Sequence, residues 1–87
     1  MWRIEFDKRA FRDLEKLGKV DRERVRRFLD ERVLALDDPR GLGSALKGDK
    51  SNLWRYRVGA IRILAKIEDD RLVVIVVAIG NRREIYR

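Results

Sequence analysis

The 87-residue sequence predicts a single α+β domain over residues 1–87, with two helices on one face of a mostly antiparallel, twisted sheet in the order β-α-α-β-β-β. Three observations lead to this prediction. The first residues alternate apolar and charged side chains, as a half-buried strand does. Residues 7–36 carry apolar side chains at helical spacing, and residues 53–79 return to alternating or continuous apolar runs of strand length.

The first strand and the first helix follow from side-chain spacing. Trp2, Ile4 and Phe6 would share one face of a strand. Asp7 is a good N-cap, because its carboxylate can accept a hydrogen bond from a free N–H group of the first turn. Gly18 is placed as the C′ residue that ends this helix. The apolar positions of the helix are Ala10, Phe11, Leu14 and Leu17.

A second helix is predicted to begin near Asp21, a further N-cap candidate, and to end at Asp37-Asp38-Pro39. Its apolar stripe consists of Val25, Phe28, Leu29, Val33 and Leu36. The two helices would form an αα-hairpin. The stretch that follows, residues 37–52, is expected to be irregular.

Three strands are predicted in the remaining sequence, at residues 53–58, 61–68 and 72–79, and they would form a meander. The last of them is apolar on both faces, which indicates a central position in the sheet. The final "GNRREIYR" would close the chain as a short edge strand.

The composition excludes several kinds of site. Lys and Arg number 22 against 15 Asp and Glu, and the net charge of +7 indicates a polyanionic partner, either nucleic acid or an acidic protein. Because the chain has neither Cys nor His, zinc sites and Cys–His or Ser–His nucleophiles are excluded, and no metal or cofactor is expected. No apolar run approaches the roughly 20 residues that span a bilayer, so no membrane contact is expected. The absence of cysteine fits a reducing compartment, and a cytoplasmic protein is expected.

After these exclusions, arginine is the residue type left as a candidate for function. In "LWRYRVGAIRIL" the apolar residues alternate with arginine, and if Trp54 and Tyr56 face the helices, the opposite face of the sheet is basic. That face would carry Arg55, Arg57, Arg62 and Lys66. The planar guanidinium fork matches phosphate oxygens, so the cluster is interpreted as a phosphate-binding surface. The simpler interpretation is a solvated surface that blunts strand edges.

The chain resembles the RelE/ParE superfamily of toxin–antitoxin toxins over nearly its whole length. The resemblance is carried by "IEFDKRAFRDLEKL", "DDPR...ALKGD", "LWRYRVGAIRIL" and "AIGNRREIYR", and the elements "YRVGxxR" and "GxRxxxY" are similar to the RelE branch. That branch implies a metal-independent endoribonuclease that cuts messenger RNA in the ribosomal A site, in contact with ribosomal RNA. The ribose 2′-OH attacks the adjacent phosphate and leaves a 2′,3′-cyclic phosphate. An acidic antitoxin of the RelB kind would restrain it.

The resemblance also implies residue roles. Arg57 matches a basic strand position, Arg62 the phosphate-stabilising arginine, Arg82 the arginine after the last strand, and Tyr86 the terminal tyrosine. The RNA-binding residues expected beside these four are Arg55, Lys66, Lys47, Lys50 and Arg83.

The proton acceptor is left open by two departures from the RelE pattern. Arg57 stands where RelE has a lysine, and Asn81 stands where many relatives have His. A guanidinium does not accept a proton at pH 7. The acceptor is therefore Tyr86, a ribosomal RNA group or water.

Two other functions are compatible with the same sequence. One is a ParE-like inhibitor of DNA gyrase with the same fold, which would not need the terminal Arg-x-x-x-Tyr. The other is a non-catalytic module that binds RNA or protein through the basic face.

Overall fold

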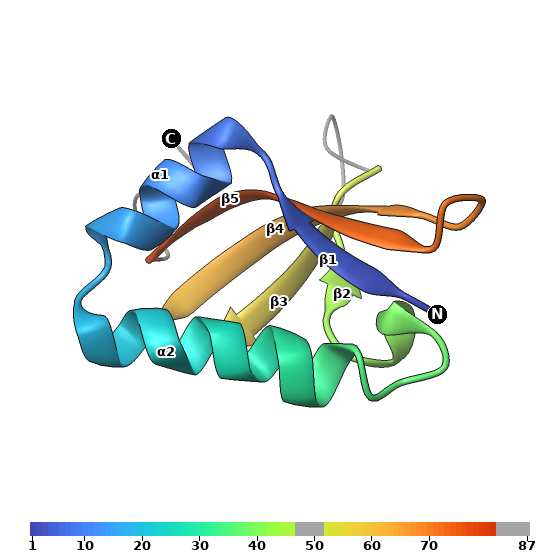
Figure 1. Ribbon diagram of the computed structural model, residues 1–87, viewed down its shortest axis with the longest axis horizontal. Coiled ribbons are helices and arrows are strands. Elements are labelled where there is room, and N and C mark those ends of the chain that lie inside the picture. The colour runs from blue at the N-terminus through green and yellow to red at the C-terminus, as the bar shows by residue number, and fades with distance from the viewer. Residues whose placement is uncertain (47–51, 82–87) are drawn as a thin grey trace.

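The computed structural model describes residues 1–46 and 52–81 and confirms the predicted α+β class. Its elements are β1 (Arg3–Phe6), α1 (Lys8–Lys16), α2 (Lys19–Arg27) continued by a π-helical segment (Phe28–Val33), a 3₁₀ turn (Pro39–Gly41), β2 (Ser44–Ala45), β3 (Trp54–Val58), β4 (Ile61–Glu68) and β5 (Val73–Asn81). Figure 1 shows α1 and α2 covering one face of the sheet. None of the helices among these residues is long and apolar enough to cross a membrane.

The sheet is five-stranded, with the order β1-β5-β4-β3-β2. The central position predicted for the last strand is confirmed, because β5 lies between β1, to which it is parallel, and β4, to which it is antiparallel. Of the expected C-terminal edge strand, Gly80 and Asn81 belong to the end of β5, and the rest lies outside the described residues.

The helix boundaries confirm one predicted cap and correct two others. The Asp7 carboxylate accepts a hydrogen bond from the Ala10 N–H at 2.9 Å and caps α1. Gly18, expected as a left-handed stop, instead has φ −62° and precedes α2, since the chain already leaves the helix at Leu17 in an extended conformation. Asp21 lies inside the first turn of α2 rather than capping it, where its charge still favours the helix dipole.

The core lies between the helices and one sheet face. Its buried members on the helices are Ala10, Leu14, Val25, Leu29 and Val33, and those on the strands include Tyr56, Ile63, Ala65, Val74 and Val76. The Tyr56 ring is fully buried and packs edge-on against Phe28 at a centroid distance of 5.9 Å. Burial raises the pKa of the Tyr56 phenol well above its usual range, so it stays a neutral hydrogen-bond donor.

The segment after α2 was expected to be irregular, but it contains the 3₁₀ turn and β2, and aromatic donors tie it to the sheet. The Tyr56 hydroxyl donates to the Pro39 carbonyl at 2.6 Å, and the Trp54 indole N–H donates to the Leu42 carbonyl at 2.7 Å. These bonds bring Ser44 and Ala45 alongside β3, where they form the short strand β2. The main chain is thereby placed so that Ser44 lies opposite Arg55.

Candidate functional site

The β3–β4 hairpin sets the geometry of the arginines. Its loop consists of Gly59 and Ala60, and Gly59 has φ +59°, a conformation that glycine adopts without steric cost. In such a two-residue hairpin the flanking residues, Val58 and Ile61, form a hydrogen-bonded pair. The next pair along the ladder is Arg57 opposite Arg62. It is a non-hydrogen-bonded pair, the type in which facing side chains lie closest together.

Arg62 lies on the middle strand of the sheet, with Arg57 opposite it on β3 and Gly80 opposite it on β5. Its side chain points to the face away from the helices, as predicted. It is however buried, with only 7% of its surface exposed, whereas Arg57 is exposed. The sequence pattern therefore assigned the face correctly but did not reveal how deeply the guanidinium lies.

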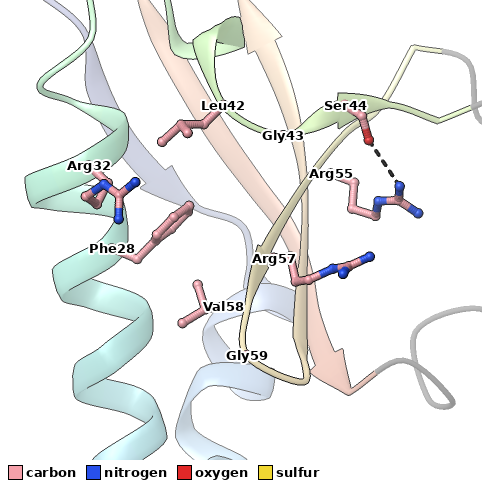
Figure 2. Close-up of a pocket in the computed structure, with 9 residues that line it drawn as sticks. All are labelled: Phe28, Arg32, Leu42, Gly43, Ser44, Arg55, Arg57, Val58 and Gly59. Atoms are coloured by element: carbon pink, nitrogen blue, oxygen red, sulfur yellow. Dashed lines mark hydrogen bonds between the residues drawn. The ribbon is translucent and has the colours of Figure 1, made fainter.

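Arg55 and Arg57 project to the same side of β3 in Figure 2. The Nη2 atom of Arg55 donates to the Ser44 hydroxyl at 3.1 Å, which holds this guanidinium near β2. Arg57 makes no hydrogen bond or ion pair within residues 1–46 and 52–81. Its guanidinium is therefore available to an anion.

Lys66 lies on the same face as the arginines, as expected, because it alternates with Arg62 and Leu64 on β4, but it is further from the hairpin than they are. It is two positions beyond Leu64 on β4, and it faces Ile75 on β5. Leu64 and Ala78 are buried in a small apolar cluster on this face, with Leu53 packed against them. The face is therefore basic at its hairpin end and apolar in its middle, rather than basic throughout.

A cleft of about 530 Å³ opens along the outer edge of β3, next to the arginines. Arg55, Arg57 and Ser44 lie on one side of it, and Phe28 and Arg32 of the π-helical segment lie on the other (Figure 2). Sequence reasoning did not single out Phe28 or Arg32 as functional. Their i, i+4 spacing, which places an aromatic ring and a guanidinium on one helix face, was the available signal.

The remaining predicted site residues are Lys47, Lys50, Arg82, Arg83 and Tyr86, and all of them lie outside the described residues. Their places relative to the arginines stay predictions.

At the end of β4 away from the β3–β4 hairpin, acidic side chains pair with arginines. Arg40 donates to both carboxylate oxygens of Asp69, at 2.9 and 2.8 Å, and Arg71 donates to Glu68 at 2.7 Å. The hydrogen bond from Arg40 lowers the pKa of Asp69. Across the described ranges there is no group of three or more acidic side chains close enough together to hold a metal ion.

Comparison with known proteins identifies similar sequences and folds. The sequence model of the family described as "ParE toxin of type II toxin-antitoxin system, parDE" matches residues 4–86. The mRNA interferase toxin RelE of Escherichia coli (strain K12) is 31% identical over 86 residues, which cover 95% of this chain and 87% of that protein. In the RelBE2 toxin–antitoxin complex of Mycobacterium tuberculosis, a chain with 25% identity matches with a TM-score of 0.85, over 93% of this chain and 98% of that one. The isolated E. coli RelE toxin matches with a TM-score of 0.73 and 24% identity, over 99% and 92% of the two chains.

Proposed function

This chain belongs to the RelE/ParE superfamily of type II toxin–antitoxin toxins, and on that premise we propose that it is a ribosome-dependent endoribonuclease that cleaves messenger RNA. The proposal places it in the cytoplasm, where a cognate antitoxin would neutralise it. The named activity of the 31% identical RelE supports this choice within the superfamily.

One observation carries the proposal, which is the direct opposition of Arg57 and Arg62 on neighbouring strands. Like charges directly opposite each other destabilise a sheet. An arrangement with that cost is expected where the two guanidiniums act together on an anion. A phosphodiester supplies the planar oxygen pairs that guanidinium forks bind.

In the proposed reaction the ribose 2′-oxygen attacks the adjacent phosphorus, and the bond to the 5′-oxygen of the next nucleotide breaks. The 2′-OH proton passes to an acceptor, the leaving 5′-oxygen takes up a proton, and a 2′,3′-cyclic phosphate remains. Arg62 would stabilise the charge that develops on the pentavalent phosphorus, because a buried, already oriented donor needs no reorganisation during the reaction. Arg57 would orient the phosphate from the exposed side. Arg82 and Tyr86 would assist the leaving group and the proton transfer.

The test is primer extension on a translated mRNA after brief induction of the toxin. The wild type is expected to produce new cuts within codons, and the same mRNA without a start codon should stay intact. Arg57→Ala should reduce cleavage about 100-fold, the scale expected when one donor to the reacting phosphate is removed. Arg27→Ala, a control on an exposed helix face where Arg27 pairs with Glu31, should cut as the wild type does. Absence of new cuts with the wild type would reject the proposal.

A second candidate is inhibition of DNA gyrase, which the family description as a ParE toxin favours. It predicts gyrase–DNA cleavage complexes in induced cells. Growth arrest would then survive Arg82→Ala and Tyr86→Ala, whereas the nuclease should lose its toxicity with either substitution.

A further inference from the structure

The cleft at the edge of β3 has a charged and aromatic helix wall that the proposed reaction does not use. Arg32 and Phe28 come from the π-helical end of α2, one helical turn apart, and both line the cleft (Figure 2). The Arg32 side chain is exposed, and within the described part of the chain it makes no hydrogen bond or ion pair. Its neighbour Arg27, by contrast, lies 3.7 Å from Glu31.

The charge of the cleft selects an anion. Three arginines are among its nine described lining residues, and none of those nine is acidic. Arg32 lies on the helix side of β3, whereas the side chains of Arg55 and Arg57 extend from β3 on the side away from the helix (Figure 2). An anionic strand that crosses the edge of β3 would therefore meet guanidiniums on both sides.

The main chain of β3 adds directional groups at the same place. The Leu46 N–H donates to the Leu53 carbonyl at 3.0 Å, so alternate β3 residues, including Arg55 and Arg57, turn their backbone groups toward β2. β2 begins at Ser44, opposite Arg55. Gly43, at φ +78°, turns the chain away before it could pair with Arg57. The backbone N–H and carbonyl of Arg57 therefore face the cleft.

The Phe28 ring supplies an apolar surface. It is half-buried, and it packs edge-on against the Tyr56 ring at 5.9 Å between ring centroids. Aromatic side chains of this kind are platforms on which unpaired bases stack. A volume of about 530 Å³ lies in the range of sites that hold a small ligand, which is large enough for one nucleotide.

We propose that this cleft binds the nucleotide next to the cleaved one in a single-stranded RNA. The base lies against Phe28, Arg32 holds its phosphate, and the strand then crosses the edge of β3 to reach Arg57 and Arg62. The proposal rests on the proposed RNA-cleaving function. It makes Arg32 and Phe28 substrate-binding residues outside the reacting centre, and it gives the RNA a defined path onto the basic face.

The test measures binding of a fluorescent RNA hexamer by anisotropy, between 50 and 200 mM salt. The RNA carries 2′-O-methyl groups so that it cannot be cleaved. Arg32→Ala should weaken binding about tenfold and lower the salt slope by about 0.7, as loss of one single-strand phosphate contact requires. Phe28→Leu should also weaken binding about tenfold, since one stacked base is lost, with the salt slope unchanged. Arg27→Ala is the matched control and should change neither quantity.

A urea unfolding curve for each variant separates lost binding from lost folding. If Arg32→Ala, folded as the wild type, binds RNA with the affinity and slope of Arg27→Ala, the cleft proposal is wrong. The same conclusion holds if Arg32→Ala weakens only the complex with the antitoxin. Because the RNA is uncleavable, this outcome is independent of primer extension. If the wild type cleaves no mRNA, the proposed nuclease function is rejected. If the wild type cleaves mRNA but Arg32→Ala binds RNA as Arg27→Ala does, only the proposal that the cleft binds RNA is rejected.

Discussion

Gly43→Ala is expected to destabilise the domain by about 2–5 kcal/mol. Gly43 has φ +78°, and a left-handed conformation costs a residue with a side chain about 1–2 kcal/mol. A Cβ atom there would lie 2.3 Å from the Arg55 carbonyl oxygen and 2.8 Å from the Trp54 indole nitrogen. The segment must therefore move off β3 and weaken the Trp54 hydrogen bond to Leu42, which adds about 1–3 kcal/mol for a poorly satisfied polar group.

Urea unfolding followed by tryptophan fluorescence measures this cost. Gly18→Ala is the control, because no atom outside Gly18 and its chain neighbours lies within 4 Å of a Cβ there, and its φ is −62°. At Gly18, alanine is a poorer N-cap, which destabilises the fold, but it also lowers the conformational entropy of the unfolded chain, which stabilises it. The free energy of unfolding is therefore expected to change by less than about 0.5 kcal/mol. If Gly43→Ala unfolds at the same urea concentration as Gly18→Ala, β2 is not held against β3 as described.

Three further predictions concern other contacts. Tyr56→Phe should cost about 1–3 kcal/mol at pH 7 by leaving the buried Pro39 carbonyl without its donor, as thermal unfolding would show. Because the folded pKa of Tyr56 is raised, its protonated form stabilises the fold below pH about 10 and this contribution is lost above it, so wild-type stability should fall there more steeply than that of Tyr56→Phe. Since the pKa of Asp69 is lowered, the stability difference between wild type and Asp69→Asn should be present at pH 7 and disappear as the pH falls below about 4; a difference that persists at pH 2 would contradict the Arg40 pairing. Arg57→Lys should speed mRNA cleavage by at least about tenfold and make it rise with pH, because an amine can accept the 2′-OH proton; a flat pH profile would argue against a base at this position.

The sequence was sufficient where local pattern decides the structure. The alternation around Tyr56 and Ile63 defined β3, β4 and the face each side chain takes, and the apolar run defined β5 as an inner strand. It was insufficient where distant contacts decide. β2 exists because Trp54 and Tyr56 hold the carbonyls of Leu42 and Pro39, and no pattern within "GLGSAL" shows this. Arg62 is buried because β4 has a strand on each side, and the alternation of residues along β4 does not predict this.

The net charge of the chain does not show how far the acidic side chains lie from the arginines, so it does not predict the charge of the site. The carboxylates of Glu68 and Asp69 lie at the far end of β4 from the hairpin, and each is bound by its own arginine. Eight residues of strand at about 3.3 Å each separate the two ends by more than 20 Å, well beyond the screening length of about 8 Å in physiological salt. Glu68 and Asp69 therefore do little to neutralise Arg57 and Arg62. Attraction of a phosphate chain depends on the few guanidiniums gathered at the hairpin, so removing one positive charge there should matter far more than removing one from the outer face of α2.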